Sequence, residues 1–337
     1  MPEHRDALLD MDPIAGPHTA HAFWIEAAGR GVLRPEALAP RGESEVLVRT
    51  LWSGISRGTE SLVFKGLVPE SEYERMRGPF MGGEFPFPVK YGYAAVGLVE
   101  EGPEPLIGRP VFALQPHQDL FIVAADMVRP LPDTVPARRA ILAANMETAL
   151  TILWDAGIQA GDRVAVFGAG VVGSLVAHLA ARVPATQVRL IDRNPQRAAL
   201  AAELGLSFST TDRLEGSFDV LVNASAAEDA LAQAIDHAGF EARIVEASWY
   251  GDRRVTIPLG GAFHSRRLQI VSSQVGGIPA GRRARWTYAR RMTTALDLLA
   301  DPRLDRLISG ETDFAALPGT YAEILSASDT LCHAIRY

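Results

Sequence analysis

The chain has 337 residues with 47% hydrophobic and 22% charged side chains, a composition typical of a globular protein with room for two domains. Its formal net charge of -7 argues against general binding of nucleic acids or anionic membranes, because such binders need a surplus of basic residues. Cys332 is the only cysteine, so one chain can form neither an internal disulfide nor a thiolate zinc cluster, and this fits a cytoplasmic protein.

The first third of the chain is rich in strand patterns and turn residues. Residues 1–21 lack the basic start and apolar middle of a signal peptide and are predicted to form an N-terminal tail. Strands are expected over 22–27, 44–55, 96–102, 109–114 and 119–125. Residues 67–80 are polar and predict a loop or a short helix. Several short strands without clear helices indicate a small barrel or sandwich.

The pattern changes at residues 129–139, where prolines and polar residues mark a domain boundary. Helices are expected over 140–157, 171–183, 194–205, 227–239, 283–300 and 321–328, and strands over 163–168, 187–192, 219–225, 241–248 and 331–337. The alternation predicts an α/β fold, a doubly wound parallel sheet with helices on both faces. No apolar run reaches the length of a membrane span.

A glycine-rich turn joins the strand at 163–168 to the next helix. Its residues are Gly168, Ala169, Gly170, Val171, Val172 and Gly173. The three glycines suit, in order, a tight turn, a close approach of the backbone to a pyrophosphate, and close packing of helix and strand. The helix N-terminus offers free N–H groups to the phosphates. A turn that binds nothing is the alternative, but the complete strand–turn–helix context favours a dinucleotide.

Asp192 ends the following strand at the distance expected for a ribose-binding carboxylate. A carboxylate there accepts hydrogen bonds from both ribose hydroxyls and repels a 2′-phosphate, which favours NAD. Arg193 beside it leaves NADP open, because a guanidinium pairs well with phosphate. Ser225 and Ser248 each end a strand and are expected at the same edge of the sheet, near the coenzyme.

With these motifs the chain resembles the medium-chain dehydrogenase/reductase superfamily, the relatives of zinc alcohol dehydrogenases, and in particular the branch of bacteriochlorophyllide hydroxyethyl dehydrogenases. The resemblance rests on residues 53–60 (SGISRGTE), 87–102 (FPVKYGYAAVGLVEEG) and 146–173. It implies a GroES-like β-barrel catalytic domain, a Rossmann domain and an active site in the cleft between them. The expected domains are 22–133 with 300–337 for the barrel, and 134–299 for the Rossmann unit. It also implies nicotinamide-dependent oxidation or reduction in a homo-oligomer, commonly a dimer.

The chain departs from the zinc-binding members at the positions that would hold the metal. Where they have cysteine it has Ser56 or Arg57, and where they have histidine and glutamate it has Tyr93 and Ala94. Glu147 stands where some relatives have a further acid near zinc, and one carboxylate alone does not hold the ion. The cysteine-rich lobe for a structural zinc is also absent. The sequence therefore predicts no zinc.

Without a Lewis acid, another group must stabilise the developing alkoxide or enolate. Tyr93 is the first candidate for a proton or hydrogen-bond donor, and a half-buried ring at a strand end is the alternative. Lys90 is a candidate for lowering the pKa of Tyr93 or binding substrate, against an exposed lysine. Glu147 and Ser56 are further candidates, against a helix-terminal acid and a simple turn residue. His117 is either a proton relay or a surface-loop histidine, the latter favoured.

Arginines gather in two late segments, at 264–267 and 282–291. They suit carboxylates or phosphates, so an anionic small-molecule substrate is one interpretation and a solvated helix face is the other. The expected function is hydride transfer between NAD, or else NADP, and an alcohol/carbonyl pair without zinc. Reduction of an activated C=C bond and a nucleotide-binding relative without catalysis are the alternatives.

Overall fold

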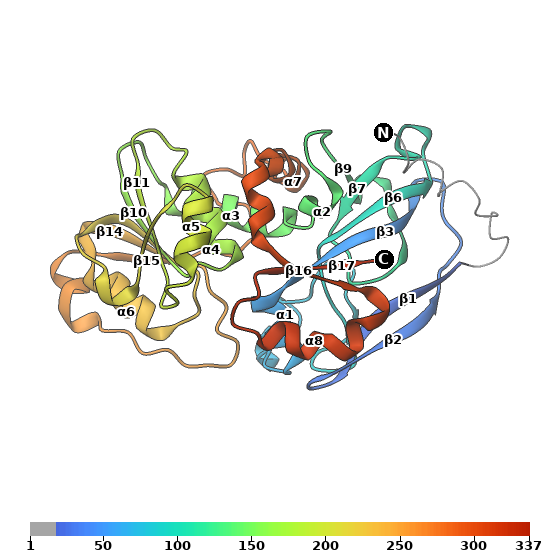
Figure 1. Ribbon diagram of the computed structural model, residues 1–337, viewed down its shortest axis with the longest axis horizontal. Coiled ribbons are helices and arrows are strands. Elements are labelled where there is room, and N and C mark those ends of the chain that lie inside the picture. The colour runs from blue at the N-terminus through green and yellow to red at the C-terminus, as the bar shows by residue number, and fades with distance from the viewer. Residues whose placement is uncertain (1–17) are drawn as a thin grey trace.

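The structure, a computed structural model, describes residues 18–337, which form two lobes side by side along the long axis of the molecule (Figure 1). One lobe holds a six-stranded parallel sheet, and the other holds a seven-stranded and a four-stranded sheet. The chain builds most of the strand-rich lobe first, then the parallel-sheet lobe, and returns to the strand-rich lobe at its end. Within the described part of the chain, every helix is too short or too polar to cross a membrane.

The strand-rich lobe contains two antiparallel-rich sheets. The larger has the order β16-β17-β3-β6-β7-β9, with β8 also paired to β3. Its strands are β3 (Glu45–Ser56), β6 (Ala95–Glu101), β7 (Pro110–Ala113), β8 (Leu120–Ala124), β9 (Arg129–Pro130), β16 (Ile308–Asp313) and β17 (Cys332–Arg336). The smaller has the order β2-β1-β5-β4, with β1 (Thr19–Ala27), β2 (Arg30–Ala37), β4 (Gly82–Gly83) and β5 (Val89–Lys90).

The helices of this lobe are α1 (Arg57–Phe64) and α8 (Leu317–Ser326). Strand β17 pairs antiparallel with β3, so the last residues of the chain complete the sheet that the first third begins. This is the C-terminal return that the resemblance implied. Helix α8 packs into the same core as α1, through Tyr321 and Leu325 on one and Val63 and Phe64 on the other.

The six-stranded sheet is parallel throughout and has the order β12-β11-β10-β13-β14-β15. Its strands are β10 (Arg163–Phe167), β11 (Gln187–Ile191), β12 (Ser207–Ser209), β13 (Phe218–Asn223), β14 (Ala238–Glu246) and β15 (Gln269–Ser272). The order reverses between β10 and β13, which is the doubly wound arrangement of dinucleotide-binding sheets. The predicted α/β fold class is confirmed.

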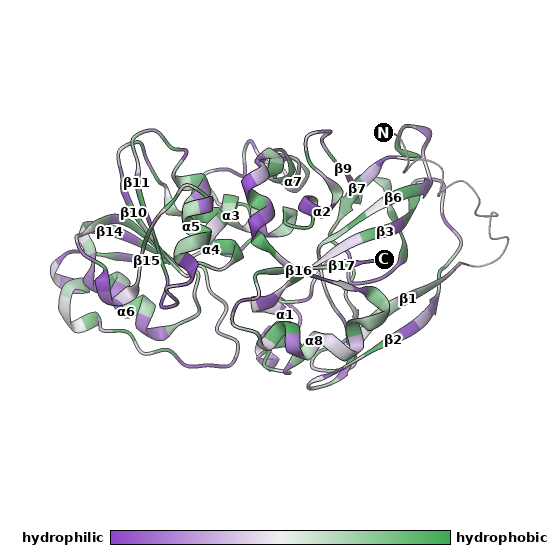
Figure 2. Cartoon of the chain, viewed as in Figure 1, coloured by the Kyte–Doolittle hydropathy of each residue, from purple (hydrophilic) through white to green (hydrophobic). Residues whose placement is uncertain are grey.

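Helices cover both faces of this sheet because its strands are apolar on both sides. On β10, Val164 and Val166 face the core shared with α3 (Ala143–Ala156), α4 (Val171–Ala180) and α5 (Arg197–Glu203), whereas Ala165 and Phe167 face α6 (Glu228–Asp236). Helix α4 is apolar around most of its surface (Figure 2), and its residues 173–180 are buried. The first of these cores also includes Ala94, Val96 and Cys332 of the strand-rich lobe, so packing is continuous between the lobes.

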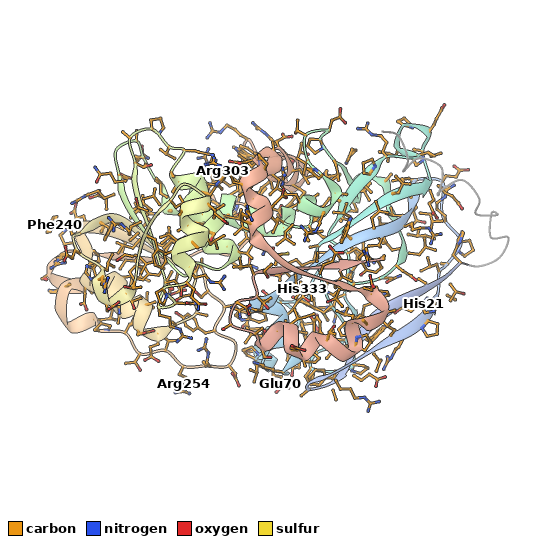
Figure 3. All side chains as sticks on the ribbon, in the orientation of Figure 1. His21, Glu70, Phe240, Arg254, Arg303 and His333 are labelled. Carbon is orange, nitrogen blue, oxygen red and sulfur yellow. The ribbon has the colours of Figure 1, made fainter. Side chains whose placement is uncertain are left out.

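Several elements differ from the expectations. The helix expected at 140–157 is divided into α2 (Ala137–Ala140) and α3, and the one expected at 283–300 begins later, as α7 (Tyr288–Asp297), where the side chain of Thr287 caps it. Strands β2, β12 and β16 were not expected. Strand β1 begins at Thr19, inside the segment predicted as a tail, and residues 1–17 of that segment lie outside the described part. Phe240, near the start of β14, is 69% exposed on the outer side of its lobe (Figure 3).

Candidate active site and coenzyme cleft

The glycine-rich turn lies between β10 and α4, as predicted. A Cβ at Gly173 would stand 1.9 Å from the carbonyl oxygen of Gly168, so the close approach of helix and strand requires glycine there. Gly168 has φ of +99°, and a Cβ on it would meet the backbone of Ser225 at 2.9 Å. A Cβ at Gly170 would meet no atom within 4 Å. Two of the glycines therefore serve packing, and the third leaves open space at the helix N-terminus.

Asp192 follows β11 and is held against this turn. Its Oδ2 accepts the backbone N–H of Ala169 at 2.7 Å, and its Oδ1 accepts that of Asn194 at 2.9 Å. The carboxylate therefore lies beside the backbone that is expected to meet the pyrophosphate. Arg193 is exposed to solvent. The remaining turn residues, Ala169, Val171 and Val172, pack into the core between the sheet and its helices.

Two arginines from different lobes bond to adjacent carbonyls of the C-terminal segment near Asp192. Arg57, at the start of α1 in the other lobe, donates to the carbonyl of Ala327 at 2.7 Å, and Arg197 donates to that of Ser328 at 3.0 Å. Burial lowers the pKa of Arg57, and the positive charge of Arg197 lowers it further, while Asp192 opposes both. The two arginines belong to different lobes, so their meeting could not be read from local sequence.

A cluster of neutral polar side chains gathers where β3 gives way to α1. Asn145 of α3 lies with Nδ2 3.3 Å from Oγ of Ser56. Tyr93 is half-buried, and burial together with the Glu60 carboxylate raises its pKa to about 12. Hydrogen bonding with the hydroxyls of Ser56 and Thr59 opposes this shift. The phenol of Tyr93 is therefore protonated at neutral pH and available as a donor.

Beneath this cluster, Glu60 is fully buried and bound on every side. Its Oε1 accepts the backbone N–H of Ser56 at 2.7 Å, and its Oε2 accepts the hydroxyl of Tyr321 and lies 2.9 Å from Nε2 of His117. The other ring nitrogen of His117 lies 2.8 Å from Oγ of Ser53. His117 is 0% exposed, so its interpretation as a surface-loop histidine is wrong: the strands fold around it.

Two other sequence candidates are engaged elsewhere. Lys90 donates to Glu36 at 2.6 Å and to Gln118 at 2.8 Å, on the smaller sheet. Glu147 accepts from Nε of Arg291 at 2.9 Å in a buried ion pair. On the same helix it is Asn145, not Glu147, that makes a hydrogen bond to Ser56. Both positions lie in one apolar helix segment, and the sequence offered no signal to choose between them.

Ser225 and Ser248 meet at the carboxyl edge of the parallel sheet. Ser225 donates to Oδ1 of Asn223 at 2.6 Å, and Ser248 Oγ accepts the backbone N–H of Ala226 at 2.9 Å. The loops after β13 and β14 are thereby joined beside the glycine turn. Trp249 packs against the core of the strand-rich lobe, so this edge contributes to the boundary between the lobes.

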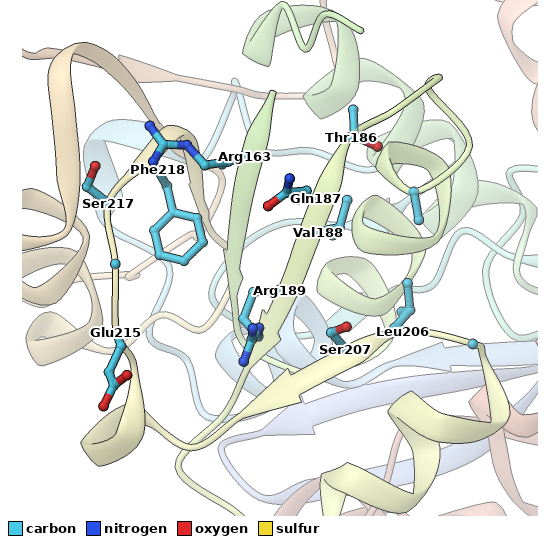
Figure 4. A pocket seen from close by; sticks show the side chains of 13 residues that line it. Arg163, Thr186, Gln187, Val188, Arg189, Leu206, Ser207, Glu215, Ser217 and Phe218 are labelled. Atoms are coloured by element: carbon cyan, nitrogen blue, oxygen red, sulfur yellow. The ribbon is translucent and has the colours of Figure 1, made fainter. Parts of the chain in front are cut away.

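A separate cavity of about 520 Å³ lies at the other end of the sheet (Figure 4). It is lined by Arg163, Gln187, Arg189, Ser207 and Phe218 among others, which belong to the starts of β10 to β13. Ligands of open parallel sheets bind outside the carboxyl ends of the strands. The cavity therefore lies at the opposite end of the strands from the glycine turn, and Arg163 within it is paired with Asp219.

The two lobes and the turn between β10 and α4 define the fold of alcohol dehydrogenase-like oxidoreductases, and comparisons with known proteins agree. D-guloside 3-dehydrogenase of Escherichia coli K12 is 23% identical over 312 residues, covering 83% of this chain and 89% of that protein. The alcohol dehydrogenase rspB of E. coli CFT073, solved with NADH, superposes with a TM-score of 0.76 at 16% identity, covering 96% of this chain and 100% of its own.

A zinc-binding dehydrogenase of Sinorhizobium meliloti 1021, solved with NADP, superposes with a TM-score of 0.75 at 19% identity over 95% of this chain and 100% of its own. No protein-family model matches the sequence. The chain is thus similar in sequence to a sugar-acting dehydrogenase and shares the fold of alcohol dehydrogenase-like oxidoreductases.

Proposed function

We propose that this protein is a zinc-independent oxidoreductase that transfers a hydride between NAD(H) and an alcohol/carbonyl pair. The observation that supports this most is the cluster of Ser56, Tyr93 and Asn145. It brings neutral hydroxyl, phenol and carboxamide groups together at the cleft, at positions where the resemblance leads one to expect metal ligands.

The donor set of this cluster does not fit zinc. Protein zinc sites use thiolate, imidazole and carboxylate ligands, and the cluster offers none of them. Within residues 18–337, no three His, Cys, Asp or Glu side chains come together as a metal site would require. Glu60 and His117 do lie close, but both are committed to the buried contacts with Ser56, Tyr321 and Ser53. The chemistry of the side chains thus favours catalysis by hydrogen bonding.

The residues around the glycine turn fit a nicotinamide coenzyme. The open space at Gly170 lies at the N-terminus of α4, where free N–H groups and the helix dipole favour phosphate. Asp192 is the proposed acceptor for the ribose hydroxyls, and Ser225 and Ser248 are proposed to lie beside the coenzyme. When bound, the coenzyme supplies the hydride donor or acceptor. We propose NAD over NADP because the carboxylate of Asp192 disfavours a 2′-phosphate.

Tyr93 is the proposed proton and hydrogen-bond donor to the substrate oxygen. Its raised pKa keeps it protonated, so it can donate to a carbonyl and stabilise the charge that develops there. Asn145 and Glu60 are positioning residues: one donates to the Ser56 hydroxyl, and the other holds the Ser56 backbone. Fixed in this way, Ser56 and Thr59 present their hydroxyls to Tyr93 without reorganisation during the reaction.

Metal analysis combined with turnover tests the proposal. Purified protein is examined for zinc by elemental analysis, and hydride transfer is followed at the nicotinamide absorbance with alcohols, ketones and enones, before and after chelation. We expect less than stoichiometric zinc and turnover that survives the chelator. Stoichiometric zinc with loss of activity on chelation would refute zinc independence. Turnover of enones alone would point to C=C reduction, and tight coenzyme binding without any turnover would point to a non-catalytic relative.

We also propose a homo-oligomer, which the resemblance supports, and a cytoplasmic location. The only cysteine is buried and unpaired, as is usual in a reducing compartment. Size-exclusion chromatography with light scattering tests the oligomeric state, and a mass of one chain would contradict it.

A further inference from the structure

A carboxylate lies at the carboxyl edge of the parallel sheet. Its strand is two strands away from the strand that leads into the glycine turn. Asn223 ends β13 and pairs in register with Phe167 of β10 on one side and with Glu246 of β14 on the other. Phe167 is followed directly by the turn at Gly168. Glu246 therefore lies at the edge where a doubly wound sheet holds its ligand.

Three donors fix the Glu246 carboxylate. Its Oε2 accepts Nδ2 of Asn223 at 2.8 Å and the hydroxyl of Tyr250 at 3.1 Å, and its Oε1 accepts the backbone N–H of Ser248 at 2.9 Å. All three partners donate, which is the arrangement that an ionised carboxylate needs. Burial and the negative charge of Glu246 raise the pKa of Tyr250, so the phenol keeps the proton that it donates.

This negative charge has no ion-pair partner. Among residues 18–337, no Lys, Arg or His nitrogen lies within ion-pair distance of Glu246, which contrasts with the buried pair of Glu147 and Arg291. Arg253 is a cation in this neighbourhood, and its guanidinium lies 5.3 Å from the centre of the Tyr250 ring. Arg253 donates to the backbone carbonyls of Tyr250 and Ala226 instead of to the carboxylate.

We propose that Glu246 favours binding of the oxidised coenzyme, because its negative charge, which has no ion-pair partner, lies on the side of the glycine turn opposite to Asp192, where the nicotinamide half would extend if Asp192 meets the other ribose. This inference rests on the proposed function, because it assumes that a nicotinamide coenzyme binds there. The oxidised ring carries one positive charge and the reduced ring carries none, while the rest of the coenzyme is identical. A fixed negative charge therefore stabilises the oxidised form selectively, so the protein binds NAD⁺ more tightly relative to NADH than it would without that charge.

A purely structural role for Glu246 makes a different prediction. The carboxylate also joins the loops after β13 and β14, through Asn223 and Ser248. If the substitution only separated these two loops, the affinities for both coenzyme forms would fall by the same factor, since both forms use the same loops. The ratio of the two dissociation constants separates charge from positioning, because effects on folding and on shared contacts cancel in it.

The experiment measures dissociation constants of NAD⁺ and NADH by titration calorimetry for the full chain, for Glu246→Gln and for Glu241→Gln. Glu241 serves as the matched control. It lies on the same strand, nearer to the start of that strand, and its carboxylate is paired with Arg267. We expect Glu246→Gln to weaken NAD⁺ relative to NADH about fivefold, as an interaction of unit charges across a partly wet cleft implies. Glu241→Gln should leave the ratio unchanged.

Arg253→Gln provides a second test that spares the buried contacts. Arg253 is exposed, and removing its charge should leave Glu246 less compensated, so NAD⁺ should tighten relative to NADH. An unchanged ratio in both Glu246→Gln and Arg253→Gln would overturn the inference, even if both affinities fell together. If the unchanged protein bound neither coenzyme form, the proposed function would fail along with it, whereas an unchanged ratio leaves the proposed function standing.

Discussion

The carboxylate of Glu60 lies 2.9 Å from Nε2 of His117 in the interior of the strand-rich lobe, and neither side chain is exposed. The pair joins the start of α1 to the segment that precedes β8. Glu60 also holds the Ser56 backbone, and Tyr321 of α8 donates to it, so three parts of the chain far apart in sequence meet on one carboxylate.

Replacing Glu60 by alanine should lower the free energy of unfolding by about 3–5 kcal/mol, because the buried groups around Glu60 lose the carboxylate to which they are bound. The N–H of Ser56, the hydroxyl of Tyr321 and the ring of His117 would each lose a partner. Urea titration followed by circular dichroism measures the change. Glu70→Ala is the control, since Glu70 is exposed on the surface (Figure 3), and it should change stability by less than about 0.5 kcal/mol. Equal effects of the two substitutions would contradict the assigned contacts.

Substituting Tyr93→Phe should reduce kcat by about 100-fold or more, the usual contribution of a positioned proton donor. Coenzyme affinity should stay within about twofold, because the phenol is remote from the glycine turn in the proposed division of roles. Stopped-flow measurement of hydride transfer and a separate coenzyme titration provide the two values. Tyr73→Phe serves as control. The ring of Tyr73 contacts that of Phe85, which begins a run of neighbouring aromatic rings that leads to Tyr93. Unchanged hydride transfer in Tyr93→Phe would return Tyr93 to a packing role.

Replacing Arg291 by methionine should destabilise the fold by about 3–5 kcal/mol at pH 7, because Glu147 stays buried without its partner. Arg291 also holds the carbonyls of Val275 and Gly277, which lose their donors. Double replacement of both charged residues by apolar ones should cost less than the sum of the single replacements.

The same variant should show a characteristic pH dependence. Burial already raises the pKa of Glu147 above its ordinary 4.5, and removal of the Arg291 charge raises it further. Because the pKa of Glu147 is raised in the folded state, protonation of its side chain stabilises the fold. This contribution to the free energy of unfolding is fully present below pH 4.5 and is lost as pH rises through the folded-state pKa. The stability deficit of Arg291→Met should therefore shrink between pH 7 and pH 4.5. A deficit that grows over this range would show that Glu147 is not a buried acid.

Asp192→Ser should weaken NAD binding by about tenfold and narrow the preference over NADP, because it removes the ribose acceptor and the charge that repels a 2′-phosphate. It also frees the N–H groups of Ala169 and Asn194. Titration with both coenzymes in parallel gives the two affinities. Asp219→Asn, near the start of β13 and paired with Arg163, is the control for a general change of charge. A loss of NAD and NADP affinity by equal factors would count against the role of Asp192 in selectivity.

The local sequence was sufficient for most of the parallel-sheet lobe and for the position of the glycine turn. Apolar runs such as 163–168 are typical of buried strands, Gly168 is favoured by its own φ of +99°, and Gly173 is required by the carbonyl oxygen of Gly168 only five residues away. A strand that was missed, β12, is short and lies at a sheet edge, where few apolar residues indicate the pairing.

The cluster around Ser56, which we propose to be catalytic, depends on contacts between residues far apart in the sequence, and no local pattern encodes them. Asn145 meets Ser56 across 89 residues, and Glu147 meets Arg291 across 144. His117 looked like a loop residue because its neighbours are polar, yet the strands enclose it. The sequence by itself determined the fold class, the dinucleotide turn and the lack of zinc-type ligands at the expected positions, since these follow from residue type and short-range geometry. Only the tertiary structure decided which polar groups face one another, because that depends on sheet register and on the return of the C-terminus to β3.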